Sequence, residues 1–257
     1  MIGRQILGRC SAMLMLAAAT AATSATRPAV VELYTSQGCS SCPPADALLG
    51  EIAKRADVLA LAFHVDYWDK LGWRDPFSLP AARKRQLDYV RHFGQDWVYT
   101  PDMVIDGHID VQGVDRQELL RRLITPRSGV PVHVTVQGED LVVSVEAATG
   151  AMESEVILVS YEPTAETVIG RGENAGRELR EFNIVRSFGT LGLWHGAAVE
   201  WRVALKTLPE DAGQVAVLVQ QPGPGPIVGA VSAVLPRYTG RGALGQPSPR
   251  GSGQSED

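Results

Sequence analysis

Residues 30–46 read VVELYTSQGCSSCPPAD, and the fold predicted for the chain depends on this stretch. An apolar strand over residues 30–34 leads into Cys39 and Cys42, which are separated by two serines. Two prolines follow directly, and proline is favoured in the first turn of a helix because the missing amide has no partner there. The stretch therefore predicts a strand, then the cysteine pair, and a helix.

Strand and helix patterns alternate from this stretch to about residue 124. An Asp106-Gly107 pair is a strong hairpin signal, and Asp115 with Glu118 forms a capping-box pattern before a last helix. The pattern predicts an α/β domain over residues 27–127 with the order β-α-β-α-β-β-α. The expected elements are a strand at 30–34, a helix after the cysteines, a strand at 58–64, a helix near 82–93, strands at 102–106 and 108–112, and a helix from 116.

The hydrophobic period changes to two beyond a linker at residues 125–129. Short alternating strands separated by turn residues predict an all-β, sandwich-like domain over residues 128–236. Residues 237–257 are rich in Gly, Pro, Ser and charge, and this composition predicts a disordered tail.

The first 26 residues are typical of a secretory signal peptide. Arg4 and Arg9 precede a small apolar run over residues 11–22, which is too short for a stable membrane span. The sequence thus predicts a periplasmic or secreted protein, and removal of Cys10 leaves two cysteines in an oxidising compartment. The 24 basic and 29 acidic residues give a net charge of −5, which excludes the basic footprint of a nucleic-acid binder.

The two remaining cysteines are the main chemical signal. Cys39 is expected at or near the helix N-cap, where unpaired amides and the helix dipole favour the thiolate, which is the nucleophile. Cys42 is expected one turn inside the helix and more deeply buried. This arrangement predicts that Cys39 attacks and that Cys42 resolves the mixed disulfide.

Thr100-Pro101 immediately precedes the first strand of the expected hairpin. If that strand runs antiparallel to the strand at 30–34, Pro101 lies against the cysteine pair. A cis Thr100-Pro101 bond would then present the Thr100 backbone to an extended substrate.

The element order, the CSSC sequence and the Thr-Pro pair resemble a thioredoxin-fold domain. The stretch at residues 30–46, with HVDYWDKLGWRDPF at 64–77 and RGENAGREL at 171–179, is similar to a secreted bacterial family of unknown function, DUF1223. The resemblance implies thiol–disulfide exchange at Cys39 and Cys42 beside Pro101, without naming a substrate. The Ser-Ser pair between the cysteines differs from those of well-studied thioredoxin relatives, so the direction of exchange stays open.

Two further residues are candidates for the site. Thioredoxins carry a buried acid near the place of Glu32, which implies a proton relay to the resolving cysteine; the alternative is a glutamate that reaches solvent. His64 ends the strand at 58–64 and could lower a thiol pKa, bind a metal, or be a buried structural histidine. Trp68 and Trp73 could form an apolar substrate lip or the local core of a long loop.

The predicted function is a periplasmic or secreted thiol–disulfide oxidoreductase that needs no cofactor and meets a protein client or redox partner. One alternative is a copper- or zinc-binding module that uses Cys39, Cys42 and His64. Another is a non-catalytic binding protein whose disulfide is structural. Residues 170–175 loosely match a dinucleotide-binding glycine pattern, but they lie among expected antiparallel strands and are interpreted as a loop that contacts the first domain.

Overall fold

The computed structural model describes residues 25–113 and 115–236. The predicted signal peptide, except for residues 25 and 26, and the predicted tail at 237–257 lie outside these ranges. In chain order the elements are β1 (Ala25–Arg27), β2 (Ala29–Thr35), α1 (Pro43–Ile52), β3 (Val58–His64), α2 (Pro80–His92), β4 (Asp102–Ile105), β5 (Ile109–Gln112), α3 (Arg116–Arg122), β6 (Arg127–Gly129), β7 (Val132–Gln137), β8 (Asp140–Val145), β9 (Ser154–Val168), β10 (Glu178–Trp194), β11 (Val199–Ala204), a 3-10 turn (Leu205–Thr207), β12 (Gln214–Gln220) and β13 (Ile227–Val234).

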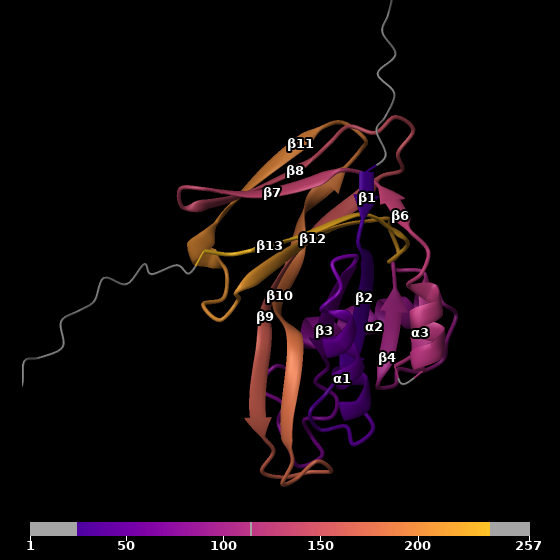
Figure 1. The fold of residues 1–257 in the computed structure, drawn as a ribbon, viewed down its shortest axis with the longest axis vertical. Coiled ribbons are helices and arrows are strands. Elements are labelled where there is room, and N and C mark those ends of the chain that lie inside the picture. The colour runs from indigo at the N-terminus through magenta and orange to yellow at the C-terminus, as the bar shows by residue number, and fades with distance from the viewer. Residues whose placement is uncertain (1–24, 114, 237–257) are drawn as a thin grey trace, which may run out of the picture.

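An eight-stranded sheet runs through the molecule in the order β13-β12-β9-β10-β3-β2-β4-β5 (Figure 1). The β2–β3 and β3–β10 pairs are parallel, and the other neighbours are antiparallel. Half of these strands come from the first half of the chain and half from the second. Among the described residues, a three-stranded sheet (β11-β8-β7) and a two-stranded pair (β1-β6) complete the β-structure.

The predicted fold class, an α/β thioredoxin-like domain plus an all-β sandwich-like domain, is wrong. The described chain is mainly β-sheet with three short α-helices, and its largest sheet joins strands from both predicted segments. The sheet extends across both segments because the outer edge of β3 would expose unpaired backbone groups in an independent α/β unit. β10 pairs with this edge at Ile184 and Ala62, and the Asn183 side chain donates a 2.8 Å hydrogen bond to the Ala60 carbonyl.

Alternation along the strands divides the first half of the sheet into two faces. Val31 and Leu33 of β2 pack on the face covered by α1 and α3, while Val30 and Tyr34 pack on the face covered by α2. The Asp106-Gly107 turn has positive φ angles at both residues, 52° and 73°, as a tight two-residue hairpin requires.

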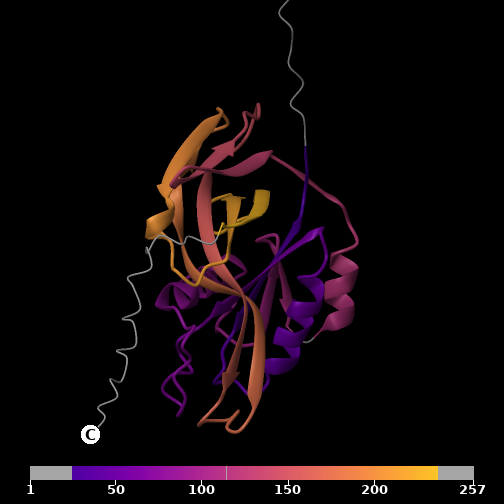
Figure 2. The same cartoon turned by 60° about the vertical axis from the view of Figure 1, so that its left-hand side comes forward.

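The three-stranded sheet packs across β9, β10, β12 and β13 (Figure 2). The core between them contains Leu141, Val143, Val217 and the fully buried Trp194. β9 and β10, with 15 and 17 residues, extend beyond this layer as one long hairpin. Figures 1 and 2 both show the hairpin following the first half of the sheet toward the opposite end of the molecule. Within the described ranges, no helix has the length and apolar character needed to cross a membrane.

Candidate functional site

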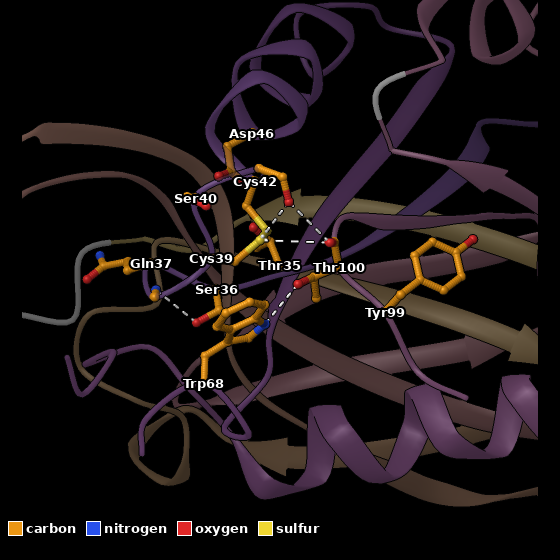
Figure 3. Close-up of a disulfide and its surroundings, with 12 residues drawn as sticks. Thr35, Ser36, Gln37, Cys39, Ser40, Cys42, Asp46, Trp68, Tyr99 and Thr100 are labelled. Carbon is orange, nitrogen blue, oxygen red and sulfur yellow. Dashed lines mark hydrogen bonds between the residues drawn. A yellow bond between two sulfur atoms is a disulfide. The ribbon is translucent and has the colours of Figure 1, made fainter. Parts of the chain in front are cut away.

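Cys39 and Cys42 form a disulfide in the loop between β2 and α1, with their Cα atoms 5.5 Å apart (Figure 3). Helix α1 begins at Pro43, so Cys42 is the N-cap and Cys39 lies three residues before it. The predicted placement, with Cys39 at the N-cap and Cys42 one turn inside, is therefore shifted by one turn. Pro43 and Pro44 explain the shift, because they occupy the first helical positions, where the absence of an amide costs little.

Both cysteines are fully buried, whereas Ser40 and Ser41 between them are exposed. The expectation that Cys39 would be the more accessible of the two is not met in the oxidised protein. The serines are the part of the disulfide loop that solvent reaches, so exposure of the sulfur atoms requires the loop or its neighbours to move.

The Thr100 backbone lies beside the disulfide. Its carbonyl oxygen is 3.8 Å from Cys39 Sγ and accepts a 3.4 Å hydrogen bond from the Ser41 hydroxyl (Figure 3). The Trp68 indole donates a 2.9 Å hydrogen bond to Thr100 Oγ1, and the Thr100-Pro101 bond is cis. Antiparallel pairing of β2 with β4 brings these residues together, as the sequence predicted for this pair of strands.

Glu32 is buried, but it faces the α2 side of the sheet. Its carboxylate receives two 2.7 Å hydrogen bonds from Arg85 and 3.0 Å hydrogen bonds from the Tyr34 and Tyr89 hydroxyls. Thr35, three positions along the same strand, faces the α1 side and contacts the helix that follows the cysteines. Strand alternation thus places Glu32 in an ion-pair network across the sheet from α1, and the solvent-reaching alternative is wrong.

His64 lies in a fully buried polar cluster on the α1 side of the sheet. Its Nδ1 is 2.7 Å from Asp75 Oδ2. Its Nε2, which has no hydrogen-bond partner among the described residues, is 3.8 Å from Glu181 Oε1. Burial opposes protonation of His64, but the carboxylates of Asp75, Glu181 and Asp46 outweigh it and raise the histidine pKa to about 9. His64 is therefore a buried cation held by acids.

Two of these acids have pKa values close to neutrality. Burial raises the pKa of Asp46 to about 6 and that of Glu181 to about 7, although the His64 charge opposes both shifts. Asp46 is four residues after Cys42 on α1 and accepts a 2.7 Å hydrogen bond from the Thr35 hydroxyl (Figure 3). Side chains four residues apart on a helix are neighbours, so this spacing could have identified Asp46 from the sequence.

Gln37 connects the disulfide loop to the His64 cluster. The backbone amide of Gln37 donates a 2.8 Å hydrogen bond to Asp75 Oδ2, and its side-chain nitrogen donates a 2.7 Å hydrogen bond to Glu181 Oε2. The Trp73 indole donates to Gln37 Oε1 at 2.9 Å, which supports the interpretation of Trp73 as part of the local core of its loop. Gln37, Asp75 and Glu181 are not recognisable from the sequence as site residues, because no local pattern reveals that they meet.

In residues 25–113 and 115–236, no group of three or more His, Cys, Asp and Glu side chains is arranged to hold a metal ion. His64 already engages Asp75 through Nδ1, and Cys39 and Cys42 are bonded to each other. The arrangement offers no support to the metal-binding alternative in this oxidation state.

Residues 30–220 match a family described as protein of unknown function, DUF1223. The chain belongs to the DUF1223 family. This membership confirms the resemblance inferred from the sequence. The DUF1223 match begins at β2 and ends at β12, so it includes the disulfide, the His64 cluster and the β9–β10 hairpin.

Among solved structures, this DUF1223 chain is similar to protein AGR_C_4864 from Agrobacterium tumefaciens, with 29% sequence identity and a TM-score of 0.71. That match covers 82% of this chain and 96% of the other. HBP35 of Porphyromonas gingivalis is similar in fold alone, with 11% identity, a TM-score of 0.59, and coverage of 87% of this chain and 81% of the other. No curated protein matches the chain.

Proposed function

We propose that this protein is a periplasmic or secreted thiol–disulfide oxidoreductase that exchanges electrons with a client through Cys39 and Cys42. The observation that carries the proposal is the position of the disulfide, directly before α1 and beside the Thr100 carbonyl. The ring closed by this disulfide contains few residues and constrains the unfolded chain little, so stabilisation alone is a weak reason for it.

The exchange proceeds in two displacements. The Cys39 thiolate attacks a client disulfide, a bond forms between Cys39 and one client sulfur, and the other client sulfur leaves as a thiolate. Cys42 then loses its proton and attacks the Cys39 sulfur, which releases the second client thiolate and restores the Cys39–Cys42 bond. Two electrons pass from the cysteine pair to the client, and a dithiol reductant returns them. The reverse sequence oxidises a client dithiol.

We assign Asp46 as the acceptor of the Cys42 proton. It occupies the next turn of α1, and Thr35 holds its carboxylate through a hydrogen bond. Burial brings the pKa of Asp46 to about 6, which is closer to that of a thiol than an exposed carboxyl group would be. A smaller pKa difference makes proton transfer less unfavourable.

Single cysteine variants test the proposal. Wild-type protein is expected to exchange its disulfide with reduced glutathione. Reduced C42S, treated with oxidised glutathione, is expected to keep a mixed disulfide with glutathione through Cys39, because the attack releases the other glutathione as a thiolate. C39S serves as the matched control and should form far less adduct, because its remaining thiol is the resolving one. Absence of exchange in the wild type, together with no adduct in C42S, would contradict the proposal.

The metal-binding alternative and the structural-disulfide alternative predict different results. A metal-binding module would retain copper or zinc in the reduced wild-type protein, and H64A would lose it. A structural disulfide would show neither exchange nor metal, and C39S would unfold at lower denaturant concentration with no other consequence.

A further inference from the structure

The turn between β9 and β10 reaches the disulfide loop from the second half of the chain. The Asn174 side-chain nitrogen donates 2.9 Å hydrogen bonds to the carbonyl oxygens of both Gln37 and Cys39, and Asn174 is only 1% exposed. Gly172, with φ of +80°, approaches the Trp73 loop so closely that an added Cβ would lie 3.2 Å from Trp73 Cβ. The turn is therefore fixed against the backbone on both sides of Gly38.

Glu173 places a carboxylate on the same loop. Its Oε2 accepts a 3.1 Å hydrogen bond from the backbone amide of Ser40, the residue directly after Cys39. The Ser40 hydroxyl and amide lower the pKa of Glu173, so this exposed side chain is ionised at neutral pH. The negative charge of Glu173 is thus hydrogen-bonded to the peptide amide that directly follows Cys39, the cysteine that we expect to attack.

We propose that Glu173 sets the redox equilibrium of the Cys39–Cys42 pair by holding its charge on the Ser40 amide. The inference deepens the proposed function and rests on it for its biological meaning. Glu173 is a positioning residue, since it touches the loop backbone and no reacting atom.

The direction of the effect follows from the charge of the reduced state. Backbone amides near a sulfur stabilise its thiolate, but Glu173 occupies the Ser40 amide and repels negative charge on Cys39. The disulfide carries no charge and is not repelled. Glu173 therefore favours the oxidised pair and makes the reduced pair a stronger reductant.

The variant that tests this is E173Q, which keeps an oxygen acceptor for the Ser40 amide and removes only the charge. At a pH where the Cys39 thiol is ionised, the E173Q disulfide should be reduced by dithiothreitol with an equilibrium constant about three-fold larger than that of the wild type, because two charges held close together at a solvent-exposed site interact only weakly in water. This change corresponds to a reduction potential about 15 mV higher. The pKa of the Cys39 thiol, followed by thiolate absorbance, should fall.

E178Q is the matched control. Glu178 is an exposed acid at the beginning of β10, so this variant makes the same charge change on the same hairpin away from the disulfide loop. Equal equilibrium constants for wild type and E173Q, or an equal shift in E178Q, would overturn the inference. The difference between wild type and E173Q should also shrink in high salt, which screens exposed charges.

The dithiothreitol equilibrium is a property of the chain itself and needs no client. If the wild type reached equilibrium with dithiothreitol but did not exchange with glutathione, the proposed function would fail while the comparison of E173Q with wild type still decided the role of Glu173. If the wild type turned over normally and E173Q were unchanged, only the inference about Glu173 would fail.

Discussion

At the scale of single residues, Glu32 shows how strand alternation assigns a role. The buried carboxylate binds Arg85 through two hydrogen bonds and lies across the sheet from α1. A buried charge that loses its partner is strongly destabilising. Glu32 is therefore expected to contribute to stability. No contact within residues 25–113 and 115–236 supports the proton relay that its resemblance to the thioredoxin acid implies.

E32Q should lower the free energy of unfolding by about 3–5 kcal/mol, because the Arg85 guanidinium stays buried without a carboxylate. Urea denaturation measures this change. Exchange at the Cys39–Cys42 pair should be retained in the folded fraction. Normal stability combined with loss of exchange would instead support the proton-relay role.

D46N tests the proton acceptor assigned to Cys42. The amide accepts no proton, so resolution of the mixed disulfide should slow by about 10- to 100-fold, while the first attack by Cys39 is unchanged. The pH profile of resolution should lose its inflection near the pKa of Asp46, which is about 6 in the folded protein. Stopped-flow measurement of both phases separates the two steps, and equal slowing of both would argue for a purely structural effect.

His64 predicts how stability depends on pH. Its pKa of about 9 in the folded protein exceeds the ordinary value of 6.5, so protonation of His64 stabilises the folded state. This contribution to the free energy of unfolding is at most about 3 kcal/mol. It is complete below pH 6.5 and is lost as the pH rises through 9. Burial also raises the pKa of Asp102, to about 8, so this carboxyl contributes to the same decline.

H64Q removes the histidine contribution and leaves that of Asp102, while Asp46 and Glu181 lose the neighbouring positive charge that opposes their raised pKa values. Its free energy of unfolding, measured by urea titration at several pH values, should fall less steeply between pH 7 and pH 9 than that of the wild type. An identical slope in both proteins would show that His64 is not a buried cation.

At the scale of elements, α1 packs on β10 through a glycine. An added Cβ at Gly50 would lie 2.3 Å from Phe182 Cδ2. Alanine favours a helix by about 1 kcal/mol over glycine, but overpacking a close contact costs about 1–3 kcal/mol. G50A is therefore expected to be less stable than the wild type by about 1 kcal/mol in chemical denaturation.

The compensating change is F182L, which removes ring atoms from the contact. G50A combined with F182L should be more stable than the sum of the two single effects predicts, because the residues touch. Additive effects would mean that α1 and β10 adjust independently.

At the scale of the whole molecule, the eight-stranded sheet determines the folding unit. An isolated fragment of residues 27–127 would leave the β3 edge unpaired and expose the parts of the α2-side core that pack on β9, β10 and β12. That fragment should fail to unfold cooperatively, whereas the full chain should show one transition by both fluorescence and circular dichroism. Two separate transitions, or a stable fragment, would support the two-domain organisation predicted from the sequence.

The sequence alone determined the local features of this protein. The prolines after Cys42 begin α1, Asp106-Gly107 forms the β4–β5 turn, and the Asp115 side chain caps α3 by accepting from the Glu118 amide. Each of these depends on residues a few positions apart, so the physical preference is visible in the printed order of amino acids.

Only the tertiary structure decided that β10 pairs with β3, and that Glu173, Asn174 and Glu181 reach the disulfide loop and the His64 cluster. Backbone hydrogen bonds between strands are nearly the same for any sequence, so an open edge does not specify its partner. The buried acids likewise gain their raised pKa values from neighbours that are far away in the chain. The presence of the cysteine pair between β2 and α1 was therefore predictable from local sequence, and the burial and electrostatic surroundings of the pair were not.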